Sequence, residues 1–155
     1  MDAEEPAPLV HTQARILPKS LKSFGSVYVH EWGTLKPIIL KDYTIQNNLE
    51  NGIYVEGAAE VTLLNCAIQE NGEHGVVLYD MPNIAFTNCT ITGNQYGISV
   101  LYMSWLAGEA RPVDTLPFAG DFARYMHAIT GSNNKIYGNR LEDLVPGEGW
   151  PAGFR

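Results

Sequence analysis

Residues 65–94 read NCAIQENGEHGVVLYDMPNIAFTNCTITGN, and this stretch begins and ends on nearly the same phrase. Asn-Cys-Ala-Ile at 65–68 returns as Asn-Cys-Thr-Ile at 88–91, which is 23 residues later. Self-similarity at a fixed period of 20 to 50 residues is typical of stacked structural units. The stretch therefore indicates a repeat architecture.

The 23-residue offset extends to both sides of this stretch. Further along the chain, apolar and Asn positions of the repeat recur at a longer spacing of 45 residues. The repeat therefore covers about residues 25–140. The offset of 23 relates Ile45, Asn48 and Gly52 to Ile68, Asn71 and Gly75, and the spacing of 45 relates Ile84, Ile91 and Asn94 to Ile129, Ile136 and Asn139.

Within one unit, apolar residues alternate with others in short runs, as at Ile53 and Val55, Val61 and Leu63, and Cys66 and Ile68. A period of two predicts strands. Three short strands per unit can pair with their own copies one unit along, about 4.8 Å away. This arrangement is a parallel β-helix, and it predicts that Ile38 pairs with Val61.

Asparagines recur where the strands of each unit meet. Gly and Asn tolerate the backbone angles of a tight corner, and stacked Asn side chains can bond to the coils above and below. Cys66 and Cys89 fall on inward positions of adjacent coils, where disulfide torsion is poorly accommodated. We expect both to be buried thiols. Two Asn-rich ladders are predicted, one of Asp42, Asn65 and Asn88 and one of Asn48, Asn71 and Asn94.

Four phrases carry a resemblance to a known group, and they cover about two-thirds of the chain. The sequence resembles right-handed parallel β-helix repeat proteins of the pectate-lyase-like superfamily, with degenerate NxIxxNxxxGI repeats. The resemblance implies a secreted, periplasmic or cell-envelope location, and it is specific for fold rather than activity. The phrases are TIQNNLENGIYV (44–55), NCAIQENGEHGVVL (65–78), NCTITGNQYGISV (88–100) and GSNNKIYGN (131–139).

The chain departs from the enzymes of that superfamily. It lacks the Asp calcium ligands with an Arg or Lys base that pectate lyases imply, and it lacks the paired Asp of polygalacturonases. It is also short, at 155 residues. A piece of a longer exported protein would explain both features. We expect no cofactor and no metal site, and the sequence favours a non-catalytic protein over an enzyme.

The predicted fold class is all-β: a single-stranded right-handed parallel β-helix (solenoid) of about 4–5 short turns. An N-terminal arm or cap covers 1–24, the repeats cover 25–140, and an extended C-terminal cap covers 141–155, where Trp150 and Phe154 pack. Gly, Pro and Asp interrupt the pattern after Leu101. We expect an inserted loop at about 102–123, followed by a strand from Arg124 to Thr130.

Alternation also predicts which side chains of the first strand in each unit point outward. They form a face with three tyrosines, a carboxylate and a histidine, which suits sugar rings because aromatic faces pack on C–H groups and polar groups bind hydroxyls. His30 and Glu56, on adjacent coils, could also act as an acid/base pair. The candidate ligand-binding residues are Tyr28, His30, Tyr54, Glu56 and Tyr79, accompanied outward by Val77, Ser99 and Leu101.

Other positions give weaker signals. His74 and Tyr96 are expected on turns as separate surface residues, and no catalytic residue is identified. Outward Ile39, Leu64 and Val77 could form an apolar stripe for an oligomer contact.

Charge and composition limit the partners. The net charge is −7, with 17 acidic and 10 basic residues, so a nucleic-acid partner is not expected. No apolar run predicts membrane insertion, and no signal peptide is visible. The favoured hypothesis is a non-catalytic β-helix module with a rigid surface for a carbohydrate or protein. The alternatives are a carbohydrate-active enzyme (lyase, hydrolase or epimerase) and a unit of an oligomeric surface or tailspike-like protein.

Overall fold

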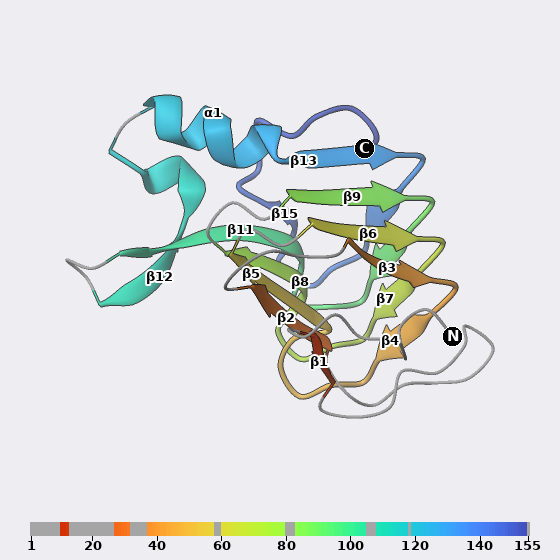
Figure 1. Ribbon diagram of the computed structural model, residues 1–155. Coiled ribbons are helices and arrows are strands. Elements are labelled where there is room, and N and C mark those ends of the chain that lie inside the picture. The colour runs from red at the N-terminus through yellow and green to blue at the C-terminus, as the bar shows by residue number, and fades with distance from the viewer. Residues whose placement is uncertain are drawn as a thin grey trace.

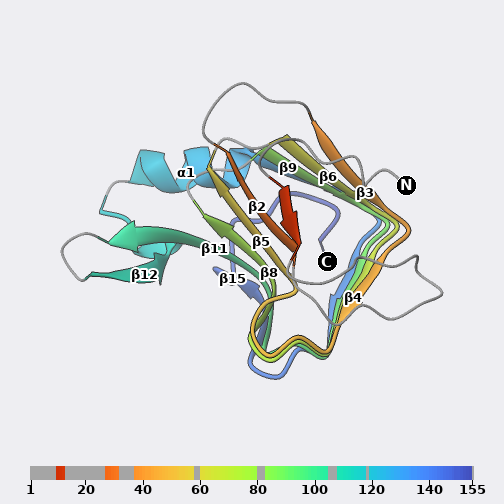
Figure 2. The same cartoon turned by 60° about the horizontal axis from the view of Figure 1, so that its bottom comes forward.

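The chain winds through three sheets whose strands come from successive repeats (Figure 1). The structure is a computed structural model, and it describes residues 10–12, 27–31, 37–57, 60–79, 83–104, 108–117 and 119–154. Seen after a turn of 60°, successive coils follow the same path (Figure 2). The described strands thus form a mostly parallel, all-β coil, as expected for a β-helix.

The first sheet has seven strands. Its parallel part contains one strand from each successive coil, and two further strands join it antiparallel. Strand β1 (Val10–Thr12) pairs antiparallel with β2, and β12 (Glu109–Pro112) pairs antiparallel with the far half of β11. The parallel strands are β2 (Val27–Glu31), β5 (Ile53–Gly57), β8 (His74–Tyr79), β11 (Tyr96–Ser104) and β15 (Glu142–Val145).

The second and third sheets are parallel and have four strands each. Short runs of alternating apolar residues form these strands, as in β6, where Val61 and Leu63 point inward. The second sheet contains β3 (Ile38–Lys41), β6 (Glu60–Leu64), β9 (Asn83–Thr87) and β13 (Ile129–Ser132); the third contains β4 (Thr44–Gln46), β7 (Ala67–Gln69), β10 (Thr90–Thr92) and β14 (Lys135–Tyr137).

The predicted register is confirmed. Ile38 pairs with Val61 and Leu40 with Leu63, at the offset of 23. Ile91 pairs with Ile136 across the longer spacing. The parallel pairing also continues in β15, past the predicted end of the repeats at residue 140.

The corners on either side of the third sheet hold residues at positive φ, and most of these residues are not glycine. Before its strands stand Asp42, Asn65, Asn88 and Asn133, whose φ values lie between 55° and 63°. After the strands stand Asn47, Glu70, Gly93 and Gly138, with φ from 56° to 72°. Asn and Asp tolerate this left-handed region better than most residues. The repeat of Asn therefore reflects a repeated backbone conformation.

Both predicted Asn ladders are present, and each is longer than expected. The inner ladder runs from Asn48 through Asn71, Asn94 and Asn139 to Asp143, with side-chain Nδ2 to Oδ1 distances of 2.8, 2.9, 3.1 and 2.8 Å. The outer ladder runs from Asn133 through Asn88 and Asn65 to Asp42, with distances of 3.1, 3.2 and 2.5 Å. These bonds join every coil to its neighbour.

The core lies between the three sheets and consists mainly of Ile, Leu and Val. Cys66 and Cys89 are both buried in it, and no disulfide joins them, as expected. The Sγ atom of Cys66 lies 3.3 Å from the carbonyl oxygen of Leu40, and that of Cys89 lies 3.3 Å from the carbonyl oxygen of Leu63. The hydrogen bond with Cys89, together with burial, raises the pKa of the Cys66 thiol.

The inserted segment is not a plain loop. β11 extends to Ser104 and forms a hairpin with β12; a 3-10 turn, η2 (Val113–Thr115), and a helix, α1 (Ala119–His127), then lead to β13. The expected strand from Arg124 is therefore wrong up to residue 128, because Phe122 and the buried Met126 lie four residues apart on one face of a helix. Asp121 in the first turn and Arg124 in the last suit the helix dipole.

The expected packing of the C-terminal aromatic residues is confirmed. Phe154 is 1% exposed and its ring meets Phe86 and Trp150 at centroid distances of 5.5 and 5.1 Å. A Cβ on Gly131 would overlap the Phe154 ring, so the glycine permits this close approach. The last residues thus cover the core beside β13. The N-terminal arm lies mostly outside the described residues.

Candidate functional site

The predicted tyrosine face lies on the outside of the first sheet. Tyr54 and Tyr79 come from neighbouring strands, and their ring centroids are 5.2 Å apart with planes inclined by 38°. The Tyr54 hydroxyl donates to Glu56 Oε2 over 2.9 Å. All three side chains are half-buried. The three residues, called the tyrosine face below, therefore combine two aromatic rings and an oriented carboxylate on a rigid sheet.

Tyr28 and His30 join this face only through their backbone. Tyr28 pairs with Tyr54, and His30 pairs with Glu56, in the parallel register of β2 and β5. Their side chains lie outside the described residues, and so does the predicted His30–Glu56 acid/base contact. The register places both residues one strand along from the tyrosine face.

The outward face is narrower than the sequence predicts. Val77 and Ser99 are only 2% and 0% exposed, so neither offers a surface to a ligand. Alternation gives the direction of a side chain but not what covers it, which explains the difference. The burial of Val77 also removes it from the predicted apolar stripe, in which Ile39 is 46% exposed.

His74 and Tyr96 are not separate surface residues on turns. They begin β8 and β11, pair in register, and stack with ring centroids 5.0 Å apart. His74 Nδ1 lies 2.7 Å from Ser99 Oγ, and burial lowers the pKa of His74 to about 4. Because Ser99 is fully buried, this His–Ser contact is a packing feature and not a nucleophile pair.

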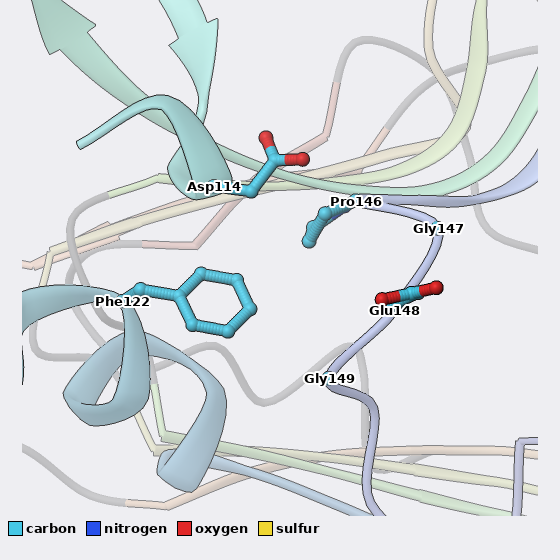
Figure 3. A pocket seen from close by; sticks show the side chains of 6 residues that line it. All are labelled: Asp114, Phe122, Pro146, Gly147, Glu148 and Gly149. Atoms are coloured by element: carbon cyan, nitrogen blue, oxygen red, sulfur yellow. The ribbon is translucent and has the colours of Figure 1, made fainter. Parts of the chain in front are cut away.

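A cavity that the sequence did not indicate lies beside α1 (Figure 3). Its volume is about 360 Å³, and it is bounded by η2, α1 and the segment after β15. Asp114 and Glu148 contribute carboxylates, and Phe122 contributes an aromatic ring. The only sequence signal was the Gly-rich run GEG at 147–149, since Asp114 and Glu148 are far apart in the chain.

The described residues give no grouping of three or more His, Cys, Asp or Glu side chains that could hold a metal ion. In the same part of the chain, no helix has the length and apolar character needed to cross a bilayer.

Residues 32–105, just under half of the chain, match the family model described as "Right handed beta helix region". The match covers the repeat phrases at 44–55, 65–78 and 88–100 and supports a right-handed β-helix repeat protein. Neither the curated proteins nor the solved structures gave a significant match. The comparisons thus agree with the fold and name no activity.

Proposed function

We propose that this β-helix is a glycan-binding module and that the tyrosine face is where sugar rings bind. The observation that carries the proposal is the Tyr54–Tyr79 ring pair with the Glu56 carboxylate held by the Tyr54 hydroxyl. Rings at 5.2 Å can pack on the C–H faces of a pyranose while the carboxylate accepts from its hydroxyls. A parallel sheet supports these groups with little freedom to rearrange.

Charge limits the class of glycan. The chain carries a net charge of −7, and Glu56 adds a negative charge to the tyrosine face. A polyanionic chain such as pectate would be repelled unless a cation intervened. Neutral or basic glycans are therefore the expected ligands. A glycan ligand fits a secreted, periplasmic or envelope location, and cell fractionation would test that part of the proposal.

The test is a glycan array probed with the purified chain, followed by titration of the retained glycans. Tyr54→Ala with Tyr79→Ala should weaken binding by at least about tenfold, because stacking contacts contribute roughly 1 kcal/mol or more. Tyr137→Ala is the matched control, since Tyr137 is an exposed tyrosine on β14 in the third sheet. Unchanged binding in the double variant would contradict the proposal.

The same experiment separates the alternatives. Shortened or unsaturated products on the retained glycans would indicate a carbohydrate-active enzyme. Absence of retention on every glycan would overturn the proposal and leave a protein-binding or structural β-helix. Circular dichroism of each variant would show that loss of binding is not loss of fold.

A further inference from the structure

The cavity beside α1 has the size and composition of a small-ligand pocket. Its volume of about 360 Å³ lies within the common range of roughly 300–1,000 Å³ for such pockets. Three separate segments meet around it, and Figure 3 shows the Phe122 ring turned toward the segment that carries Glu148. The lining residues are Asp114, Phe122, Pro146, Gly147, Glu148 and Gly149.

Phe122 forms the apolar wall of this cavity. Gly149 has φ +87°, and a Cβ at this position would overlap the end of the Phe122 ring. The glycine backbone can therefore lie against the ring edge. As a result, the ring is held between α1 and the 146–149 segment. An aromatic ring fixed in this way can receive the C–H face of a sugar or a nearby cation.

The polar wall is negatively charged. Asp114 and Glu148 are exposed, and neither takes part in an ion pair among the described residues. By contrast, the neighbouring acids Glu109 and Asp121 pair with Arg111 and Arg124. Among the described residues, no Lys, Arg or His lines the cavity. Two uncompensated carboxylates beside an aromatic ring favour a cationic group.

We propose that this cavity binds the ammonium group of an amino sugar, with the sugar ring against Phe122 and the ammonium between Asp114 and Glu148. The inference rests on the proposed glycan-binding function and names the substrate class. A hexosamine supplies both features that the cavity lacks, a positive charge and a C–H face. The glycan preferred by the protein is therefore one with unacetylated amino groups.

Three tetrasaccharides with the same β-1,4-linked glucose backbone provide the test. They carry an amine, an acetamide or a hydroxyl at carbon 2, as glucosamine, N-acetylglucosamine and glucose tetramers. Calorimetric titration at low salt should show the glucosamine tetramer binding about tenfold more tightly than the other two. This preference should decrease with added salt, because the carboxylates are exposed.

The variant Asp114→Asn with Glu148→Gln keeps the shape of both side chains and removes their charges. It should abolish the preference, so that the glucosamine tetramer binds no more tightly than the glucose tetramer. Glu50→Gln with Glu73→Gln is the matched control, because it removes two exposed charges from another corner of the coil. The control should retain the preference.

Equal binding of the three tetramers, or a preference that survives Asp114→Asn with Glu148→Gln, would overturn the cavity assignment. Failure of the proposed function has a different signature. In that case no tetramer binds, or Tyr54→Ala with Tyr79→Ala changes none of the affinities. A preference lost equally in the Glu50/Glu73 control would mean that net charge acts at a distance, and it would also overturn the assignment.

Discussion

Single residues explain why each Asn ladder ends in an aspartate. An Asn inside a ladder donates through Nδ2 on one side and accepts through Oδ1 on the other. The last member needs only to accept, and a carboxylate does only that. Asp143 ends the inner ladder toward the C-terminus, and Asp42 ends the outer ladder toward the N-terminus. The two ladders therefore run in opposite directions along the coil.

Glu70 is the residue that fits its position least well. It stands at φ 56° in a row that otherwise holds Asn47, Gly93 and Gly138. A side chain with a Cβ is disfavoured there by roughly 1 kcal/mol. Its carboxylate lies over Gly93, where a Cβ would overlap it. This pairing could not be predicted from sequence, because the row becomes visible only when the φ values are known.

His74 gives the protein a pH-dependent stability. Its pKa falls from 6.5 to about 4 on folding because the ring is buried. Above pH 6.5 both states are neutral and the stability is fully present. As the pH falls toward 4, only the unfolded state gains the proton, and up to about 3 kcal/mol of the free energy of unfolding is lost.

Urea unfolding of the wild type and His74→Phe between pH 7 and pH 4 would measure this effect. As the pH falls, the free energy of unfolding should decrease more for the wild type than for His74→Phe. Carboxylate titrations affect both proteins equally and cancel in this comparison. His127→Gln, at an exposed position of α1, should follow the wild type. A difference that stays constant with pH would show that His74 does not titrate in this way.

At the scale of the element, the inner and outer Asn ladders differ in burial. They should therefore contribute different amounts to the free energy of unfolding. Asn71 is fully buried, and its Oδ1 accepts from both the backbone N–H and the side chain of Asn48. Asn71→Ala leaves those donors without their acceptor, which costs about 3 kcal/mol. Asn88 is exposed, and a glycine in its place tolerates φ 55°. Asn88→Gly should therefore lower the free energy of unfolding by less than about 1 kcal/mol.

Urea unfolding at one pH gives both values, and a parallel slope with denaturant shows that the unfolded states are comparable. Equal costs for Asn71→Ala and Asn88→Gly would contradict the view that burial decides how much a ladder stabilises.

The strands of the repeat could be predicted from the sequence, whereas the segments that interrupt the repeat could not. A 23-residue period fixes the register, because a strand in a parallel coil pairs with its own copy. Helix α1 has no copy, and its nine residues give only about two and a half turns of helical periodicity. The tyrosine face lies on strands of the repeat, so the alternation of apolar residues predicted it. The cavity between Asp114 and Glu148 could not be predicted in this way. Its walls belong to segments outside the repeat.

At the scale of the whole molecule, the coil must protect its open edges. In the described part of the chain, β1 pairs along β2, while β12 and β15 share the two halves of β11. The second sheet ends at β13, beyond which the backbone N–H of Asn134 donates to the Gly153 carbonyl over 3.2 Å. The end of the coil is thus covered by the chain itself.

Phe154 is the side chain on which this cover depends most. It packs on Phe86, Trp150 and the backbone of Gly131, while the Trp150 Nε1 donates to the Pro146 carbonyl over 2.6 Å. Phe154→Ala should lower the free energy of unfolding by about 3–5 kcal/mol, since it leaves a large cavity in a buried site. Loss of the cover would also expose the β13 edge, and concentration-dependent association should follow.

Urea unfolding and sedimentation velocity measure the two effects, with Leu141→Ala, at an exposed leucine, as the control. A Phe154→Ala protein as stable and as monodisperse as the control would show that the coil end does not need this cover.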